Sequence, residues 1–160
     1  MPRLSKLSRS IAGRAALVTG AAGFAGRHLC QLLHEHGEAV HAMVAPPNHK
    51  ASVTGAAEHF AVDLMDLEGL TKLLELSRPA TVYHLAALSS PEQSWKSRRL
   101  TYETNFFGTL NLLEAVLASK LSPRIVLIGS ASVYGAVAES RQPVSESEPL
   151  DPRDPYGVSK

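Results

Sequence analysis

Short apolar runs alternate along the chain with longer segments in which apolar residues recur at helical spacing. The runs suit buried strands, and we place them at 15–19, 39–44, 59–62, 81–85 and 124–129. Helical spacing is found at 24–36, 67–77 and 98–120. Strands that alternate with helices predict β-α-β units with right-handed crossovers. The expected fold class is therefore α/β, a doubly wound parallel sheet.

The first thirteen residues do not share this pattern. Residues 1–13 are basic, rich in serine and free of acidic residues. Transit peptides have this composition, and so do plain terminal extensions. We expect a disordered extension here, followed by one folded domain that spans residues 14–160.

The last part of the chain loses the pattern again. Residues 135–155 have no apolar period and contain four prolines, which predicts a long loop that is either functional or mobile. Asp154 and Pro155 are typical of a helix N-terminus, yet the sequence ends at Lys160. We therefore expect an N-terminal part of a longer protein, with its sheet incomplete and its substrate domain absent.

Composition excludes several classes of protein. Sixteen Lys and Arg face fifteen Asp and Glu, a balance that argues against nucleic-acid binding. No apolar run reaches the roughly 18 residues of a membrane span. The single cysteine, Cys30, excludes an internal disulfide and fits a cytoplasmic location. No cluster of His, Cys and Asp has zinc spacing, so we expect no metal site.

A glycine-rich loop follows the first expected strand. Gly20, Gly23 and Gly26 stand between this strand and the first helix. Glycines let the main chain approach a pyrophosphate closely at the positive end of a helix. The spacing G-x-x-G-x-x-G would also suit a tight structural turn. The flanking strand and helix favour a dinucleotide-binding site of the Rossmann type.

The end of the second strand bears on the choice of cofactor. Residues 40–50 contain no acid that could hold an adenosine 2′-hydroxyl, whereas His41, His49 and Lys50 are present. This favours NADP over NAD, although His49 and Lys50 could equally be solvated loop residues. Asp63 stands at the expected carboxyl edge of the sheet, where it could meet the adenine or simply form a turn.

A tyrosine and a lysine four residues apart end the chain. Tyr156 and Lys160 would share one face of a helix. A cation close to a phenol favours the phenolate, so the pair suits proton transfer to or from an alcohol or sugar oxygen. The spacing Y-x-x-x-K is common by chance, but its place after the fifth strand of a glycine-loop fold makes it specific.

With these motifs the sequence resembles the extended short-chain dehydrogenase/reductases, also known as the NAD-dependent epimerase/dehydratases of nucleotide sugars. The resemblance runs from about Ala15 to Lys160. It rests on ordered blocks at family spacing, namely Thr19-Gly20-x-x-Gly23-Phe24-x-Gly26, Asp63-Leu64, His84-Leu85-Ala86-Ala87, Asn105 with Gly108-Thr109, Ser130-x-x-x-Tyr134-Gly135 and Tyr156-x-x-x-Lys160.

The resemblance implies a set of cofactor-binding residues. The pyrophosphate would be held by Gly20, Gly23, Phe24, Ala25 and Gly26, and the adenine would be flanked by Asp63 and Leu64. The cofactor would be lined by Leu85, Ala86 and Ala87, with Asn105 supporting the site from the long helix. The nicotinamide end would be bound by Tyr156 and Lys160.

The resemblance also implies a catalytic set. Tyr156 would be the acid/base, Lys160 would bind the nicotinamide ribose, and Ser130 would hydrogen-bond the substrate oxygen. A serine at the end of a strand is ordinarily a cap, which is the alternative for Ser130. Its place four residues before Tyr134-Gly135 favours the catalytic role.

The blocks are most similar to the branch of the family that acts on GDP-sugars. Its dehydratases place an acid directly after the catalytic Ser or Thr, because elimination of water needs an additional acid and base. Ala131 and Ser132 stand there instead. We therefore expect a reductase of the GDP-4-keto-6-deoxy-mannose type. A 4-epimerase, a 4,6-dehydratase and a non-catalytic dinucleotide-binding fragment remain the alternatives.

Partners follow from the same resemblance. The substrate would be a nucleotide sugar, and the full-length protein would form a homodimer through its long helix and its Tyr/Lys helix. We expect an exposed apolar stripe on one side of the long helix, made of Tyr102, Phe106, Leu110, Leu113, Val116 and Leu117.

Overall fold

The structure is a computed structural model that describes residues 14–46 and 52–160. The extension expected at 1–13 and the cations His49 and Lys50 lie outside the described residues.

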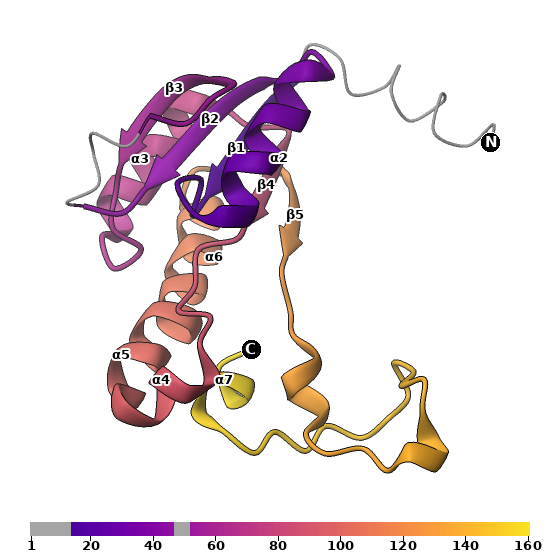
Figure 1. Ribbon diagram of the computed structural model, residues 1–160. Helices are drawn as coiled ribbons and strands as arrows, with labels where there is room; N and C mark the ends of the chain where they lie inside the picture. The colour runs from indigo at the N-terminus through magenta and orange to yellow at the C-terminus, as the bar shows by residue number, and fades with distance from the viewer. Residues whose placement is uncertain (1–13, 47–51) are drawn as a thin grey trace. The chain divides into compact units, whose positions relative to one another are not determined.

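A parallel sheet of five strands organises the chain in the order β3-β2-β1-β4-β5 (Figure 1). This is the strand order of a Rossmann sheet, so the expected fold class is confirmed. The strands are β1 (Ala15–Thr19), β2 (Ala39–Val44), β3 (Ala56–Ala61), β4 (Thr81–His84) and β5 (Arg124–Leu127).

Helices and helical turns connect the strands. They are α2 (Phe24–Glu35), α3 (Leu67–Ser77), α4 (Pro91–Lys96), α5 (Arg98–Tyr102), the π-turn η2 (Glu103–Phe107), α6 (Gly108–Ala118), the 3-10 turns η3 (Ala131–Tyr134) and η4 (Glu139–Arg141), and α7 (Pro155–Val158). The chain forms two compact units. Unit 1 contains residues up to 86 and 110–128, and unit 2 contains 87–109 and 129–160.

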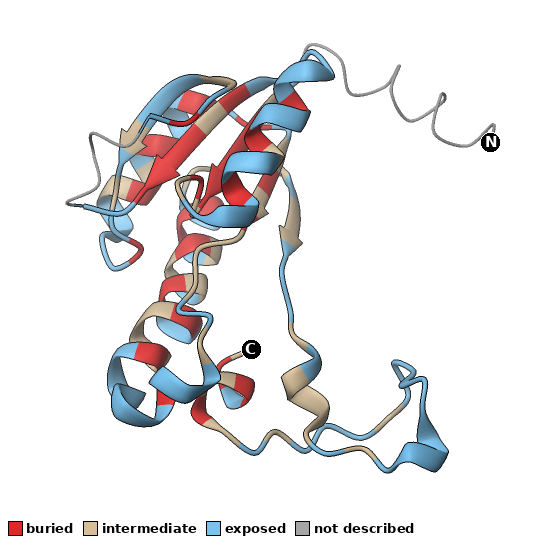
Figure 2. Ribbon diagram, in the orientation of Figure 1, coloured by how far each residue is buried: buried red, intermediate tan, exposed pale blue. Residues whose placement is uncertain are grey.

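Alternate residues of the strands in unit 1 face two apolar layers. On one face Leu17 of β1 belongs to a cluster with the buried leucines of α3 and with Leu112 of α6. On the other face Ala16 and Val18 pack with Cys30 of α2. Both faces of the sheet are therefore covered, as a doubly wound fold requires. The buried strands are red in Figure 2.

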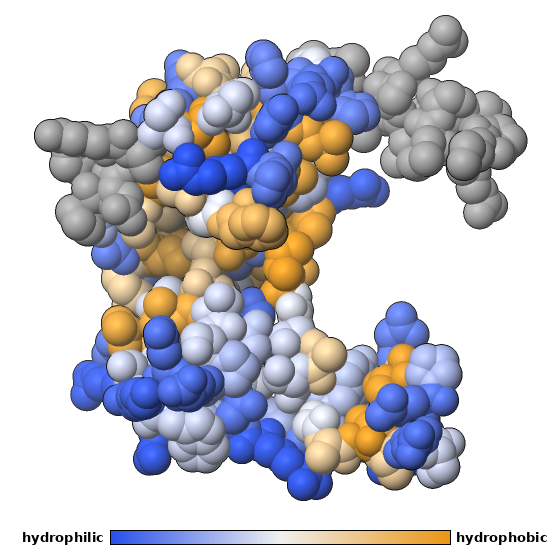
Figure 3. Space-filling model, in the orientation of Figure 1, coloured by the Kyte–Doolittle hydropathy of each residue, from blue (hydrophilic) through white to orange (hydrophobic). Residues whose placement is uncertain are grey.

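Three strands differ from the sequence-based expectation, and β4 does so only by ending at His84 instead of residue 85. β3 was placed at 59–62, but it begins at Ala56, directly after Gly55 with φ +83°. It is an edge strand with mostly exposed residues, so it lacks the apolar pattern that marks a buried strand. β5 ends at Leu127 rather than at residue 129, because its partner β4 ends at His84, which lies opposite Leu127. Leu127 and Ile128 are half exposed, and Figure 3 shows apolar surface along β5.

The long helix also differs from the expected regular helix over 98–120. A π-turn, η2, separates α5 from α6, and Thr109 Oγ1 donates to the Asn105 carbonyl at 2.6 Å. Val116 was assigned to the exposed apolar stripe, but it is buried with Leu112 in the core. Leu117, in contrast, is 78% exposed. The helix therefore carries apolar residues on both its buried side and its exposed side.

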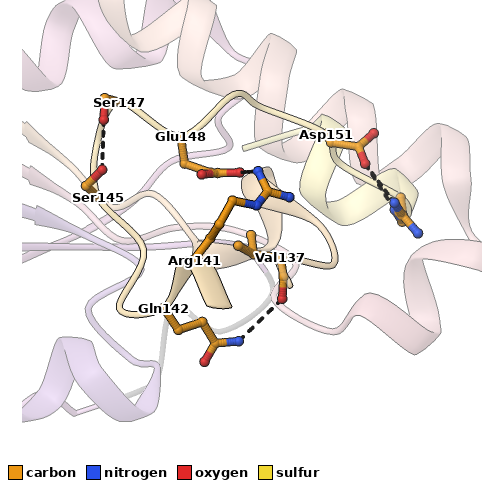
Figure 4. A network of polar contacts seen from close by, with 8 residues as sticks. Val137, Arg141, Gln142, Ser145, Ser147, Glu148 and Asp151 are labelled. Atoms are coloured by element: carbon orange, nitrogen blue, oxygen red, sulfur yellow. Dashed lines mark hydrogen bonds and ion pairs between the residues drawn. The ribbon is translucent and has the colours of Figure 1, made fainter. Parts of the chain in front are cut away.

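In unit 2 the two ends of the long loop, near residues 133 and 151, lie side by side. The Asp151 N–H donates to the Val133 carbonyl at 3.0 Å, and Gly135 adopts φ +63°. Within the loop Arg141 pairs with Glu148, as Figure 4 shows. After the loop, Asp154 caps α7 by accepting from the Gly157 N–H at 2.7 Å, which confirms the helix start predicted from the sequence.

Candidate cofactor and catalytic sites

The glycine loop, residues 20–26, is packed too closely for side chains at two positions. Gly20 has φ +66°, and a Cβ there would lie 2.7 Å from the Ala86 nitrogen. A Cβ on Gly26 would lie 2.3 Å from the Gly20 carbonyl oxygen. Gly23 is less crowded, since its Cβ would meet only that same oxygen at 3.2 Å. The absence of a side chain at Gly20 and Gly26 therefore lets the loop pack closely, with Gly20 against Ala86, two residues after the end of β4.

The loop leaves the first turn of α2 open to an anion. Gly23 is the N-cap of this twelve-residue helix and offers no side-chain cap, and no acidic residue lies in the first turn. The first amides of a helix have no intrahelical acceptor, and they favour negative charge. Phe24 and Ala25 of this turn are exposed. The cradle and its uncapped amides thus fit the pyrophosphate of a dinucleotide.

A hydroxyl beneath the glycine loop joins β1 to the end of β4. Thr19 Oγ1 accepts from the Ala86 N–H at 3.1 Å and lies 2.7 Å from His84 Nδ1. Thr19 and His84 are both buried and directly opposite in the sheet. The sequence analysis assigned no role to either side chain. The sequence does contain a hint of this contact, because each of the two neighbouring apolar strands ends in a polar residue.

The residues expected around the adenine differ in their exposure. Asp63 is exposed, and its Oδ1 accepts from the Met65 N–H at 2.9 Å, so it does form a turn. Leu64 is buried in the core, and its carbonyl accepts from Asn111 Nδ2 at 2.9 Å. Any contact between Leu64 and an adenine would therefore involve its main chain.

The residues after β4 are partly open. Leu85 and Ala86 are half-buried and pack against opposite apolar layers of unit 1. Ala87 is half-buried as well and belongs to unit 2. Ala86 lies against the glycine loop, since a Cβ on Gly20 would lie 2.7 Å from its nitrogen.

In unit 2, Ser130 and Lys160 line one hollow of about 560 Å³. Ser130 is the N-cap of η3, where its Oγ accepts from the Ser132 N–H at 3.2 Å. The serine therefore does act as a cap, and it also faces the hollow. Tyr156 is half-buried and is not one of the lining residues. The full lining consists of Gly129, Ser130, Ala131, Val133, Tyr134, Leu150, Pro152, Gly157, Val158 and Lys160.

Lys160 is partly buried, and this desolvation lowers the pKa of its ammonium below the ordinary value of 10.5. Within residues 14–46 and 52–160, no hydrogen bond or ion pair holds the Lys160 side chain. Its three N–H donors remain available to a ligand with hydroxyl groups.

Asn105 joins three segments of unit 2. Its Oδ1 accepts from the Leu88 N–H at 2.7 Å, and its Nδ2 donates to the Leu88 carbonyl at 3.0 Å. The same Nδ2 donates to Ser159 Oγ at 2.9 Å. Asn105 is 4% exposed and lies in η2. It thus links the long helix to the segment after β4 and to the end of α7.

Two further features of the described residues bear on the class of protein. None of the helices in this part of the chain is long and apolar enough to cross a membrane. The described residues also bring together no group of three or more His, Cys, Asp and Glu side chains that could hold a metal ion.

Comparisons with known proteins agree with this arrangement. The family model described as GDP-mannose 4,6 dehydratase matches residues 17–160. GDP-mannose 4,6 dehydratase 2 of Caenorhabditis elegans is 32% identical, with 92% of this chain and 42% of that protein covered. GDP-6-deoxy-D-mannose reductase of Pseudomonas aeruginosa is 35% identical, with 89% and 42% covered. The chain thus spans about two fifths of the length of these curated relatives.

A solved structure shows the same fold. UDP-glucose-4-epimerase from Stenotrophomonas maltophila, with bound NAD and formylated UDP-arabinopyranose, has a TM-score of 0.83 and 31% identity. The match covers 92% of this chain and 45% of that one. Dehydratases, reductases and epimerases of nucleotide sugars thus all resemble the chain. From the sheet order, the glycine loop and the matched family model, the chain belongs to the GDP-mannose 4,6 dehydratase family, a group of Rossmann-fold enzymes within the extended short-chain dehydrogenase/reductases.

Proposed function

We propose that the chain supplies the cofactor-binding and proton-transfer residues of an NAD(P)-dependent reductase of the GDP-4-keto-6-deoxy-mannose type. One observation carries the choice of reaction. Among the described residues that line the hollow beside Ser130 and Lys160, none is Asp or Glu.

The missing carboxylates distinguish reduction from dehydration. Elimination of water needs one group to protonate the leaving hydroxyl and another to remove a carbon-bound proton. Ala131, directly after Ser130, lines the hollow and can do neither. Reduction of a ketone needs only a hydride and one proton. The reductase of Pseudomonas aeruginosa, at 35% identity, is a relative of this kind.

Each catalytic residue has one task in this proposal. When bound, the dinucleotide would supply a hydride to the sugar carbonyl carbon. Tyr156 gives its phenolic proton to the carbonyl oxygen, and Ser130 donates a hydrogen bond to that oxygen. The Lys160 ammonium donates to the hydroxyls of the nicotinamide ribose. Lys160 suits this task because its donors have no partner among the described residues.

We propose NADP(H) as the preferred cofactor. The described end of β2, with Val44 followed by Ala45 and Pro46, contains no acid that would hold a ribose 2′-hydroxyl. NAD is the alternative, because the epimerase from Stenotrophomonas maltophila contains NAD. Comparing the affinities for NADPH and NADH separates the two.

A 4-epimerase is the second candidate. The observation in its favour is the structural match to a UDP-glucose-4-epimerase with a TM-score of 0.83. A Ser/Tyr/Lys set can serve both reactions, because each moves a proton on a sugar oxygen during hydride transfer. An epimerase would retain its dinucleotide through purification, whereas a reductase must exchange it in every turnover.

We also propose that the full-length protein is a homodimer. Leu110 and Leu117, one heptad apart on α6, are 40% and 78% exposed. Exposed apolar residues at this spacing favour packing against another helix. Light scattering on the protein would show a dimer, and a monodisperse monomer would count against this proposal.

The reaction is tested by mixing the protein with NADPH and a GDP-4-keto-6-deoxy sugar. We expect loss of NADPH absorbance and formation of the reduced sugar, both abolished by Tyr156→Phe. Interconversion of sugar epimers without net NADPH loss would favour the epimerase. Cofactor binding without any turnover would favour a non-catalytic dinucleotide-binding module.

A further inference from the structure

The main chain of Tyr156 is held at its amino end by a buried serine. Tyr156 lies in the first turn of α7, where an N–H has no intrahelical acceptor. Ser94 Oγ of α4 accepts from this N–H at 3.2 Å. Ser94 is 2% exposed, and its hydroxyl proton is directed to the Pro91 carbonyl at 2.6 Å. The Ser94 oxygen is therefore fixed as an acceptor for Tyr156.

A second buried serine holds the carboxyl end of the same residue. Ser159 Oγ donates to the Tyr156 carbonyl at 2.7 Å and is 7% exposed. The Ser159 oxygen itself accepts from Asn105 Nδ2. Because the two bonds to Leu88 fix the orientation of the Asn105 amide, the direction of this chain of hydrogen bonds is determined.

The short helix that carries Tyr156 is held by contacts with its neighbours rather than by an apolar cluster. Asp154 caps it, and it packs against α4, α5 and η3. α7 has four residues, and a single turn is costly to form alone. The two apolar clusters found among the described residues both lie in unit 1, whereas α7 lies in unit 2. The bonds to Ser94 and Ser159 are directional. They therefore order the main chain of Tyr156 and also fix its position.

We propose that Ser94 and Ser159 are positioning residues that fix the Tyr156 main chain at both ends and so set the orientation of its phenol for proton transfer. This inference rests on the proposed function, in which Tyr156 is the proton donor. Neither serine is assigned to contact substrate or cofactor. In this proposal their effect on turnover passes through Tyr156.

The test compares Ser94→Ala and Ser159→Ala with two matched serine variants. Ser90→Ala removes the N-cap of the same helix α4, where Ser90 accepts from the Gln93 N–H. Ser77→Ala removes a buried hydroxyl that donates to the Leu73 carbonyl in unit 1. Both controls lose a serine hydrogen bond without touching Tyr156.

The readouts are amide exchange at Tyr156 and the ring signal of isotope-labelled Tyr156, identified with Tyr156→Phe. We expect Ser94→Ala to raise exchange of the Tyr156 N–H by about tenfold, the loss of one buried hydrogen bond. Ser159→Ala should shift the ring signal, and Ser159→Thr, which keeps the hydroxyl, should restore it. In turnover, kcat should fall about tenfold with little change in KM for both alanine variants.

The proposal is overturned if Ser94→Ala and Ser159→Ala leave the Tyr156 signals as in the wild type, or if Ser90→Ala moves them equally. Amides of the sheet, such as Val18 and Val82, report whether each variant is folded. The exchange and ring measurements need no cofactor or turnover. They therefore test the positioning role even if the proposed reaction does not take place. If the reaction does take place and neither alanine variant changes it, the positioning role is overturned and the proposed function stands.

Discussion

The two units of the chain are stabilised in different ways. In unit 1 the buried interior is mostly apolar, with Leu17, Leu70 and Leu74 fully enclosed. In unit 2 the buried side chains include Ser94, Asn105 and Ser159, all of them hydrogen-bonded. Burial of a leucine contributes about 1.5–3 kcal/mol, whereas a neutral hydrogen bond contributes about 0.5–1.5 kcal/mol.

This difference matches the different functions that we assign to the two units. The apolar unit 1 provides a rigid sheet edge that carries the glycine loop. The polar unit 2 holds Ser130 and the main chain of Tyr156 by directional hydrogen bonds, which fix geometry at little gain in stability. We therefore expect unit 2 to open locally at a lower free energy than the sheet of unit 1. Four substitutions, each paired with a control, test this comparison.

The largest effect is expected in the core of unit 1. Leu74→Ala leaves a cavity beneath the sheet and should lower the free energy of unfolding by about 3 kcal/mol. Leu76 lies on the same helix α3 but is 75% exposed, so Leu76→Ala should change stability by less than about 0.5 kcal/mol. Urea denaturation measures both. Equal losses for the two variants would contradict the assigned core.

The next effect is expected at the glycine loop. Gly20→Ala forces a side chain into φ +66° and against the Ala86 nitrogen, so we expect a loss of about 2 kcal/mol and no dinucleotide binding. Gly129→Ala is the control for stability, because a Cβ there would meet nothing within 4 Å. Calorimetry with NADPH and urea denaturation give the two readouts. Normal affinity in Gly20→Ala would remove the loop from the cofactor site.

A smaller and more local effect is expected in unit 2. Asn105→Ala leaves the Leu88 peptide and Ser159 without their partner, at a cost of about 1–2 kcal/mol. Faster amide exchange should appear at Leu88 and in α7 while the sheet stays protected. Asn111→Ala, which removes a bond to the Leu64 carbonyl in unit 1, should leave α7 unchanged. Equal exchange throughout the chain would contradict two separately stabilised units.

The smallest effect concerns pH. Burial lowers the pKa of Lys160, so the unfolded chain holds this proton more tightly than the folded one. The free energy of unfolding should therefore rise as the pH increases from the lowered pKa to 10.5. Below the lowered pKa, Lys160 is charged in the folded chain, and the full cost of its desolvation reduces stability. Lys160→Met should raise the urea midpoint slightly at neutral pH and abolish this rise.

Lys72 provides a control of opposite sign. Its hydrogen bond to Glu68 raises the pKa of Lys72, so its contribution is present below 10.5 and is lost as the pH passes the raised value. Lys72→Met should lower stability slightly at neutral pH. A rise with Lys72→Met or a fall with Lys160→Met would contradict the assigned environments.

The sequence predicted the buried elements well, because their apolar pattern reflects the packing directly. β1, β2 and α3 have the expected bounds. The edge strand β3 was misplaced because its exposed residues carry no such pattern. The π-turn η2 was not expected, since apolar spacing alone does not reveal how Asn105 bonds to the Leu88 peptide.

The candidate site was predictable only where a motif is local in the sequence. The glycine loop is of this kind, and it lies between β1 and α2 as expected. The Tyr156/Lys160 pair is also local in the sequence, but α7 ends at Val158, so Lys160 lies beyond the helix that was expected to carry both residues, and the role of the pair stays a prediction. The contacts of Ser94 with Tyr156 and of Thr19 with His84 join residues 62 and 65 positions apart. No spacing rule connects such pairs, so they become visible only in the folded chain.

The central claim is that the glycine loop on the sheet of unit 1 binds a dinucleotide. A calorimetric titration of the purified chain with NADPH and with NADH, repeated on Gly20→Ala, tests it most directly. We predict saturable binding by the wild type, tighter for NADPH, and none by Gly20→Ala. Absence of binding for both dinucleotides in the folded wild-type chain, or equal binding by Gly20→Ala, would contradict the claim.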